Sequence, residues 1–325
     1  MRGSVSPSVR VVIITLDNHL AAAVERANDA MAADRVSIRL FAASDWDRDA
    51  AVLERAKAAI AEADVVIATM LFLEDHIRAI HPALAARRED CDAMVGLMSA
   101  GDIVKLTKLG GYRMDAPAKG PLALLKKLRG SSGKDGKPNS GAGQMKMLRR
   151  LPKILRFIPG AAQDVRQYFL TLQYWLAGSD DNVVAMVRGL IDRYASGERA
   201  ALKGKLPAQA PREYPEVGVY HPAIAGGLTE DAAQLPRSKD ARGTVGVLML
   251  RSYLLGKDAG HYDGMMAALE AQGLNVIPAF ASGLDARPAI DRYFVKGGQP
   301  LVDAVVNLTG FSLVGGPAYN DVDAA

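Results

Sequence analysis

Short apolar runs alternate with amphipathic segments over the first hundred residues. The strand-like runs are Val11–Leu16, Val36–Phe41, Val65–Met70 and Ala93–Met98, and the helical patterns between them are His19–Ala33, Arg48–Ala63 and Glu74–Arg88. Continuous β-branched runs are typical of parallel strands buried on both faces. Because βα connections are short and crossovers are right-handed, the pattern predicts a doubly wound parallel-sheet α/β domain.

Helical periodicity returns in the middle of the chain, at Gln163–Ala177 and Asp181–Tyr194, and we expect Asp180 to cap the second helix. Apolar side chains recur at helical spacing in the first of these segments, at Tyr168, Phe169, Leu172, Trp175 and Leu176. This stripe predicts a helix face packed in the core rather than a platform for a ligand.

A second α/β unit follows a polar, proline-bearing link. Its expected strands are Thr244–Leu250, Asn275–Ala279 and Ala304–Leu308, with helices near His261–Gln272 and Ala286–Val295. The chain stops at DVDAA, where a covering helix should begin, so we expect this unit to be truncated and the chain to be an N-terminal fragment.

Four parts follow from these patterns. They are an α/β domain at 1–103, a basic linker or insertion at 104–160, a helical segment at 161–215 and the incomplete second α/β unit at 216–325. Between Val104 and Arg156 there are fourteen Lys/Arg residues against two acids, a net +12, so the rest of the +4 chain carries −8. Such a block marks a solvated insertion or an anionic partner.

Composition narrows the class of protein. The single cysteine, Cys91, excludes a disulfide framework and fits a reducing, cytoplasmic compartment. No apolar run is long enough for a transmembrane segment, and no secretory signal opens the chain. The basic block has too few aromatic residues to predict nucleic-acid binding. The end of this block, MKMLRRLPKILRFIP, has a basic and an apolar face, so a peripheral position at the membrane remains an alternative. Pro152 makes this alternative weaker, because a proline kinks or splits a helix.

Candidate chemistry gathers where the strands of the second unit end, because parallel sheets bind ligands beyond their carboxyl ends. The substrate-binding candidates there are Arg251, Ser252, Lys257, His261 and Tyr262, with His221 as a second histidine elsewhere. Arg251 or Lys257 could hold a carboxylate. His261 could bind a metal or accept a proton, or it could simply begin its helix. The sequence contains no Cys/His cluster with zinc spacing. It also contains no phosphate loop, so we expect no nucleotide site in this chain.

Four segments resemble one family in the same order along the chain. They are MSAGDIVKLTKLGGYRM (Met98–Met114), LMLRSYLLGKDAGHY (Leu248–Tyr262), IPAFASGLDARPAI (Ile277–Ile290) and NLTGFSLVGGPAYND (Asn307–Asp321). They resemble the large H subunit of magnesium chelatase. The related cobaltochelatase large subunit of cobalamin biosynthesis is the nearest alternative, and the first and last segments look more like the magnesium branch.

The resemblance implies a porphyrin-binding large subunit that inserts Mg²⁺ into protoporphyrin IX, a step towards chlorophyll or bacteriochlorophyll. It implies I and D partner subunits of the AAA+ class, which bind and hydrolyse ATP, and the downstream methyltransferase as a further partner. Arg251 or Lys257 would then hold a porphyrin propionate. The base is expected beyond residue 325, so this chain alone is predicted to be inactive. A non-catalytic scaffold or binding module remains the alternative.

Overall fold

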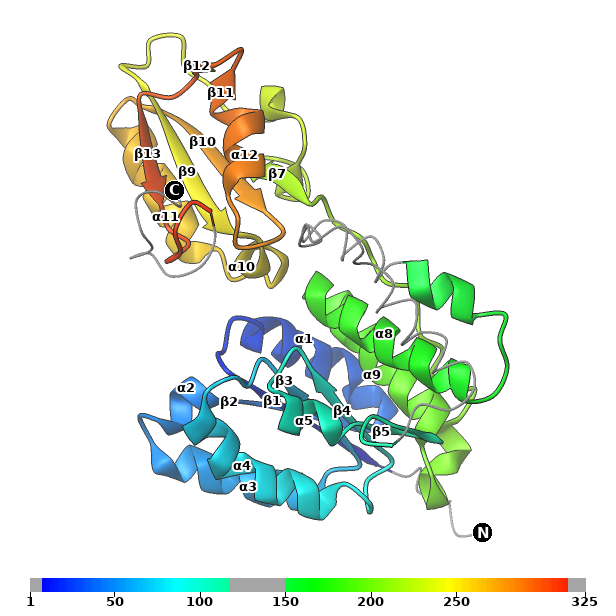
Figure 1. The fold of residues 1–325 in the computed structure, drawn as a ribbon. Coiled ribbons are helices and arrows are strands. Elements are labelled where there is room, and N and C mark those ends of the chain that lie inside the picture. Colours follow the sequence, from blue (N-terminus) through cyan, green and yellow to red (C-terminus); the bar gives the residue numbers. More distant parts are fainter. Residues whose placement is uncertain (1–7, 117–149, 315–325) are drawn as a thin grey trace, which may run out of the picture. The chain divides into compact units, whose positions relative to one another are not determined.

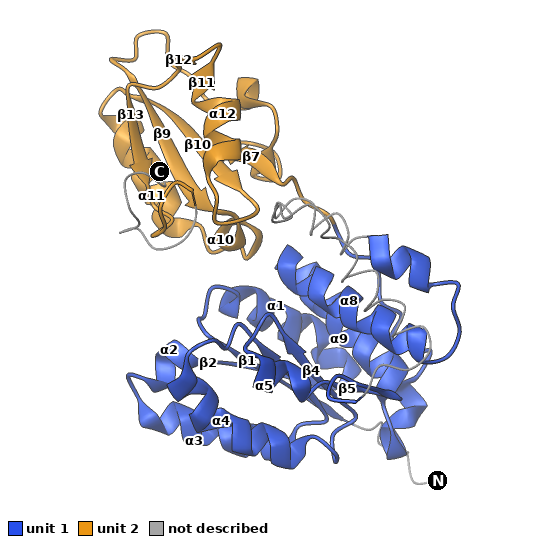
Figure 2. Cartoon of the chain, in the orientation of Figure 1, with its two compact units in different colours: residues 1–212 blue, residues 213–325 orange. Residues whose placement is uncertain are grey.

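The computed structural model describes residues 8–116 and 150–314 of the 325-residue chain. The chain divides into two compact units, Met1–Arg212 and Glu213–Ala325 (Figure 2). Each unit has its own sheet and its own hydrophobic core. Most of the predicted basic insertion falls at residues 117–149, outside the described residues.

The first unit alternates strands and helices along the chain (Figure 1). Its strands are β1 (Val9–Thr15), β2 (Val36–Ala42), β3 (Val65–Thr69), β4 (Ala93–Leu97), β5 (Lys108–Leu109) and β6 (Tyr112–Arg113). Its helices are α1 (Ala21–Met31), α2 (Ala43–Trp46), α3 (Ala50–Glu62), α4 (Glu74–Arg87), α5 (Gly101–Lys105), α8 (Ala161–Ala177) and α9 (Asp180–Tyr194), with short 3₁₀ turns η1 (Ala32–Asp34) and η2 (Gly197–Leu202).

The strand order of the first sheet is β2-β1-β3-β4-β5-β6, and β1 to β4 pair in parallel. From β1 the chain goes first to β2 on one side and then to β3 on the other, which places helices on both faces (Figure 1). The core on one face includes residues of α1, α8 and α9, and the core on the other includes residues of α3 and α4. The predicted doubly wound α/β domain is confirmed.

Burial on both faces explains why the strands read as unbroken apolar runs. Ile13 of β1 and its register partner Ile67 of β3 belong to the core beneath α1, α8 and α9. The next pair, Ile14 and Ala68, belongs to the core beneath α3 and α4. Since successive side chains of a strand point to opposite faces, the central strands β3 and β4 are buried at every position.

Helix α8 confirms the predicted core stripe. Leu172 and Trp175 are buried in the core, and Tyr168, Phe169 and Leu176 pack against it. The expected cap of α9 was wrong by one position, because the side chain of Ser179, not of Asp180, accepts a hydrogen bond from the Asn182 amide.

The segment Met98–Met114 belongs to the first sheet. After α5 it forms the hairpin of β5 and β6, and β5 pairs antiparallel with β4. A Cβ at Gly96 in β4 would lie only 2.4 Å from the Ile103 carbonyl oxygen, so the backbone of α5 packs directly on the strand. The sheet therefore extends past residue 103, where the basic segment was expected to begin.

The second unit is built around a smaller mixed sheet. Its strands are β7 (Val217–Tyr220), β8 (Leu228–Thr229), β9 (Thr244–Leu250), β10 (Asn275–Ala281) and β13 (Ala304–Asn307), with a separate hairpin of β11 (Val295–Lys296) and β12 (Gln299–Pro300). Its helices are α10 (Arg251–Leu255), α11 (Gly260–Ala271) and α12 (Arg287–Tyr293), with the 3₁₀ turn η3 (Ala232–Gln234).

The sheet order is β13-β9-β10-β7-β8, and the three predicted strands β9, β10 and β13 pair in parallel. The sequence did not predict β7 and β8, which add antiparallel strands beside β10. Strand β7 has only four residues, fewer than the usual strand, so its apolar pattern is too short to stand out. The carboxyl ends of β9, β10 and β13 share one edge of the sheet.

Candidate functional site

Five of the six predicted substrate-binding residues lie together, in the segment that follows β9. Arg251 and Ser252 begin α10, Lys257 lies in the turn after it, and His261 and Tyr262 lie in the first turn of α11. This segment leaves the sheet at its carboxyl edge, where doubly wound proteins bind ligands. We refer to it as the β9 edge.

Two residues of the β9 edge stabilise the backbone around it. Arg251 is only 8% exposed, and its Nη1 donates a hydrogen bond to the Pro215 carbonyl oxygen at 2.8 Å. The Tyr262 side chain is 1% exposed, and its hydroxyl oxygen accepts a hydrogen bond from the Leu250 amide at 3.1 Å. Burial raises the pKa of Tyr262, more than this hydrogen bond lowers it. Both side chains therefore position the edge.

Lys257 and His261 are the exposed members of the β9 edge. Lys257 has a left-handed backbone with φ of 53°, which is uncommon for a residue other than glycine. The His261 ring packs against Tyr253, with centroids 5.2 Å apart, and against Tyr262 at 3.8 Å. A lysine and an imidazole held on an aromatic cluster can receive an anionic group such as a carboxylate. Ser252 is half-buried beside them.

His221 lies elsewhere in the second unit. Its Nδ1 accepts a hydrogen bond from the Ala223 amide at 3.1 Å, so a neutral ring carries its proton on Nε2 and donates to Glu270 at 3.1 Å. Glu270 is nine residues after His261 on α11, which at 1.5 Å per residue is about 13 Å along the helix axis. The structure therefore does not bring His221 together with the other five residues.

The carboxyl edge of the first sheet holds residues that sequence reasoning missed. Met70 and Met98 directly follow β3 and β4 and have left-handed backbones, with φ of 57° and 41°. Beside them Phe72 and Leu73 are each 55% exposed and Met98 is 39% exposed. The available signal was the apolar run Met70–Leu73, which continues past the end of the strand where polar loop residues are usual.

His19 lies at the same edge, between β1 and α1. Its Nδ1 is in hydrogen-bond contact with Asp17, and its ring packs edge-on against Trp175 of α8 at 6.4 Å. Burial opposes ionisation of Asp17, but the contact with His19 outweighs it and lowers the pKa of this carboxyl. His76, in the first turn of α4, is buried, and its Nε2 is hydrogen-bonded to Asp47 at 2.8 Å.

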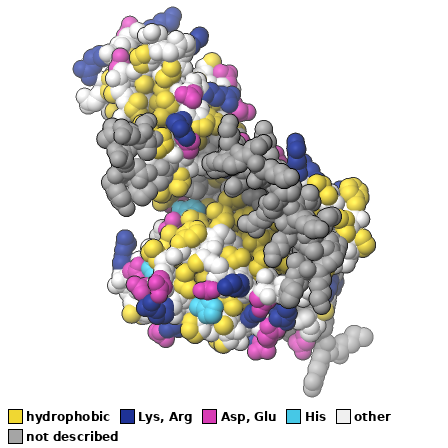
Figure 3. All heavy atoms as spheres, in the orientation of Figure 1, with side chains coloured by type: hydrophobic (Ala, Val, Ile, Leu, Met, Phe, Trp, Pro, Cys, Tyr) yellow, Lys and Arg dark blue, Asp and Glu magenta, His cyan; other side chains and the backbone are white. Residues whose placement is uncertain are grey.

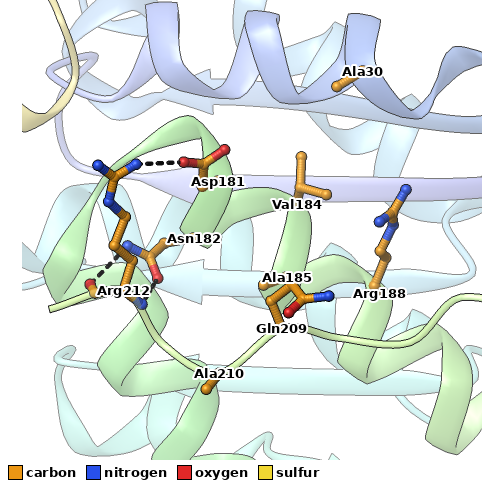
Figure 4. A pocket seen from close by; sticks show the side chains of 9 residues that line it. All are labelled: Ala30, Asp181, Asn182, Val184, Ala185, Arg188, Gln209, Ala210 and Arg212. Atoms are coloured by element: carbon orange, nitrogen blue, oxygen red, sulfur yellow. Dashed lines mark hydrogen bonds and ion pairs between the residues drawn. The ribbon is translucent and has the colours of Figure 1, made fainter.

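A cavity of about 400 Å³ lies in the first unit between α1, α9 and the segment before residue 212 (Figure 4). Arg212 pairs with Asp181 at 2.9 Å at one end, and Arg188 at the other end pairs with Asp34 at 3.0 Å. Asn182 also accepts a hydrogen bond from the Arg212 amide. The charged groups neutralise one another, so the cavity offers no net charge to a ligand.

Across 8–116 and 150–314, no group of three or more His, Cys, Asp or Glu side chains is arranged to hold a metal ion. No helix in these ranges has the length and apolar character needed to cross a membrane.

Comparison with known proteins identifies the family. Residues 172–325 match the family model CobN/Magnesium Chelatase, and residues 10–169 match a domain of unknown function, DUF3479. The H subunit of magnesium chelatase from Cereibacter sphaeroides is 51% identical over 332 residues, which cover 100% of this chain and 27% of that protein. The chain belongs to the magnesium-chelatase H-subunit family.

A more distant relative agrees with this assignment. The chloroplastic ChlH subunit of magnesium chelatase from Oryza sativa subsp. indica is 33% identical over 97% of this chain and 24% of its own length. A solved structure of the catalytic subunit of cobaltochelatase from Mycobacterium tuberculosis is 16% identical. The match covers 93% of this chain and 18% of that one, with a TM-score of 0.44. The chain spans about a quarter of the length of these magnesium-chelatase relatives.

Proposed function

We propose that this chain is part of a large subunit that inserts Mg²⁺ into protoporphyrin IX for chlorophyll or bacteriochlorophyll synthesis. The observation that carries the proposal is the 51% identity to the H subunit of a magnesium chelatase over the whole chain. In this proposal Mg²⁺ and the porphyrin are substrates, and I and D partner subunits bind and hydrolyse ATP. The downstream methyltransferase would receive the product. The single cysteine supports a cytoplasmic location, and a peripheral position at the membrane is compatible with it.

Within this function we assign Lys257 and His261 to the porphyrin carboxylates. Both are exposed at the β9 edge, while Arg251 and Tyr262 are buried and bonded to backbone groups. Ser252 would add a hydroxyl to the same contact. His221 would not take part, because its partner Glu270 lies about 13 Å from His261 along α11. The ammonium group of Lys257 can neutralise a propionate, and an imidazole N–H can donate a hydrogen bond to it, without contact to the ring.

The insertion chemistry requires more than these residues. Two pyrrole N–H protons must leave the ring, and Mg²⁺ must lose tightly held water. The described residues contain no cluster of three or more carboxylate, histidine or cysteine side chains for the ion. We therefore propose that the chain alone is inactive, and that a Mg²⁺ insertion assay with purified I and D subunits gives no turnover. Turnover by the chain alone would contradict this.

A chimeric large subunit tests the function itself. The matching N-terminal quarter of the Cereibacter sphaeroides protein is replaced by this chain, and Mg²⁺ insertion is measured with the I and D subunits. Insertion at a rate within about tenfold of the parent supports the function, whereas a folded but inactive chimera contradicts it.

The same chimera tests the β9 edge. Lys257→Ala with His261→Ala is expected to raise KM for protoporphyrin IX with little change in kcat, because the lost contact binds the substrate and transition state equally. Lys239→Ala removes a charge from another exposed lysine of the second unit and serves as the matched control. An unchanged KM in the double variant would remove Lys257 and His261 from the site.

A further inference from the structure

The residues that lead into α8 are fastened to the first unit along one side. Residues 150–158, which we call the α8 approach, begin with a helical stretch, and Leu155 within it is 2% exposed and belongs to the core that includes α8. Gln163 of α8 donates a hydrogen bond from Nε2 to the Leu155 carbonyl oxygen at 2.7 Å. Pro152, which was expected to disturb this helix, is buried, and its carbonyl oxygen accepts a hydrogen bond from Arg166 Nε at 3.1 Å. The α8 approach therefore holds a fixed place against α8.

The other side of the α8 approach presents apolar side chains to solvent. Phe157 is 82% exposed and Ile154 is 60% exposed, more than any other large apolar side chain in the described part of the chain. Both lie on one turn, since the Phe157 amide donates a hydrogen bond to the Ile154 carbonyl oxygen at 3.4 Å. Figure 3 shows hydrophobic side chains gathered on the side of the first unit where the chain leads into α8 in Figure 1. A surface helix normally turns polar residues outwards, so these side chains indicate an interaction surface.

Three cations flank the two apolar side chains. Arg150, Lys153 and Arg156 are exposed, and none of them forms an ion pair within the described ranges 8–116 and 150–314. No acidic residue lies between Arg150 and Gln163 in the sequence. Burial, and after it the charge of Arg156, lowers the pKa of Arg166, which is the effect of positive charge without a compensating acid. Such a surface attracts an anionic partner.

We propose that the α8 approach docks the first unit on an anionic lipid surface. Ile154 and Phe157 enter the boundary between headgroups and acyl chains, and the three cations beside them contact the anionic headgroups. A lipid bilayer uses both properties of this surface, because it is apolar inside and, where its lipids are anionic, negatively charged outside. The proposal goes beyond the insertion of Mg²⁺ and does not depend on it.

Other anionic partners fit the α8 approach less well. Nucleic acid would pair with the cations, but bases stack on several aromatic side chains, and Phe157 is the one aromatic residue of this segment. Ile154 would have no role in such a complex. A folded acidic protein would need a groove matched to two protruding side chains, whereas the headgroup region of a membrane is soft and admits them. The lipid surface therefore explains both kinds of side chain.

The test is a flotation assay of the chain with vesicles of equal parts phosphatidylglycerol and phosphatidylcholine, and with vesicles of phosphatidylcholine alone. The wild type should bind the anionic vesicles at least about tenfold more tightly than the neutral ones, and added salt should weaken this binding. Ile154→Ser with Phe157→Ser should raise the lipid concentration for half-maximal binding at least about tenfold. Both side chains are exposed, so the variant should fold.

Matched controls come from the second unit. Leu284→Ser with Leu301→Ser changes two leucines that are 47% and 46% exposed, and should leave vesicle binding unchanged. Arg150→Gln with Lys153→Gln should weaken binding to the anionic vesicles, whereas Lys239→Gln with Lys296→Gln, at exposed lysines of the second unit, should not.

A tryptophan in place of Phe157 reports the contact directly. Phe157→Trp keeps a large aromatic side chain, and indole suits the membrane interface. Its fluorescence should shift to shorter wavelength with anionic vesicles and stay unchanged with neutral ones. Trp46 and Trp175, the chain's own tryptophans, are 6% and 3% exposed and give a constant background.

Three results would overturn the proposal. The first is equal vesicle binding by the wild type and the folded Ile154→Ser, Phe157→Ser variant, because charge elsewhere in the chain would then suffice. The second is the absence of binding to anionic vesicles. The third is binding to single-stranded DNA or polyglutamate without binding to vesicles, which would assign the surface to nucleic acid or to an acidic protein. None of these results decides whether the chimeric large subunit inserts Mg²⁺, so the proposed function stands or falls separately.

Discussion

The hydroxyl of Tyr194 donates a hydrogen bond to the carboxylate of Asp164 at 3.0 Å. The same carboxylate accepts hydrogen bonds from the Gly111 amide at 3.1 Å and from Arg193 Nε at 3.0 Å. Burial, strengthened by the charge of Asp164, raises the pKa of Tyr194. One acid thus ties α8 and α9 to the turn between β5 and β6. The Leu109–Arg113 part of the segment Met98–Met114 therefore has a structural role, because it links the sheet to α8 and α9.

Replacing Asp164 should destabilise the first unit. Asp164→Ala leaves the Tyr194 hydroxyl and the Gly111 amide without their acceptor, and each hydrogen bond to a charged group contributes about 1.5–3 kcal/mol. We expect the free energy of unfolding to fall by about 3 kcal/mol in urea denaturation. Asp291→Ala, at an exposed position, should change it by less than about 0.5 kcal/mol. Equal effects of the two substitutions would contradict this role of Asp164.

Gly96 should tolerate no side chain. A Cβ there would lie 2.4 Å from the Ile103 carbonyl oxygen and 2.9 Å from its carbon, which are backbone atoms that cannot turn aside. Gly96→Ala should therefore lower the free energy of unfolding by about 3 kcal/mol, the upper range for overpacking. Gly101→Ala is the control, because nothing lies within 4 Å of its Cβ position. A Gly96→Ala protein as stable as Gly101→Ala would show that α5 does not pack on β4 in this way.

Replacing either of two buried threonines with valine should stabilise the protein. The hydroxyls of Thr15 and Thr69 are buried and have no hydrogen-bond partner among the described residues. Thr15→Val or Thr69→Val removes an unpaired polar group, which should raise the free energy of unfolding by about 1 kcal/mol.

Thr107 provides the opposite case in the same unit. Its Oγ1 accepts a hydrogen bond from the Gly96 amide at 2.9 Å, and the side chain is fully buried. Thr107→Val should lower the free energy of unfolding by about 1–2 kcal/mol. Chemical denaturation should therefore show a lower free energy of unfolding for Thr107→Val and a higher one for Thr15→Val and Thr69→Val. The same sign in all three variants would contradict the prediction.

Acid should weaken the fold partly through Glu89. Both oxygens of this carboxylate accept hydrogen bonds from Arg113 at 2.7 Å, which lowers the pKa of Glu89 from 4.5 to about 2. The unfolded chain then binds the proton more readily, so this stabilisation is present above pH 4.5 and is lost as the pH falls towards 2. Urea midpoints measured from about pH 6 to about pH 2 should decline less steeply for Glu89→Gln. Identical slopes would show that the pair contributes nothing to the acid response.

The sequence was most informative where burial on both faces left a strong pattern. Ile13 and Ile14 fill opposite cores, so β1 reads as a continuous apolar run and its parallel pairing could be predicted. The two-residue strands β5 and β6 carry no such period, and the Gly110–Gly111 turn between them reads equally well as a linker. Their place in the sheet depends on the distant Asp164, which no local pattern contains.

The sequence predicted that five candidate residues lie together, but not which of them are buried and which are exposed. A cation directly after a parallel strand pointed to the β9 edge, and five residues do meet there. Residue type alone could not separate Arg251, which is buried against the Pro215 carbonyl, from the exposed Lys257. His221 was named as a second histidine, and its contact with Glu270, which is 49 residues away in the chain, could not be predicted from the sequence.

The late position of α8 and α9 also bears on how the chain folds during synthesis. Strands β1 to β4 are complete at Leu97, but part of the core over one of their faces is supplied by residues up to Tyr194. At roughly 5–20 residues per second, the ribosome needs about 5–20 s to add that stretch. Throughout this interval the nascent sheet has one apolar face covered only in part, by α1. Nascent chains released before Tyr194 should therefore be far more prone to aggregate than chains released after it.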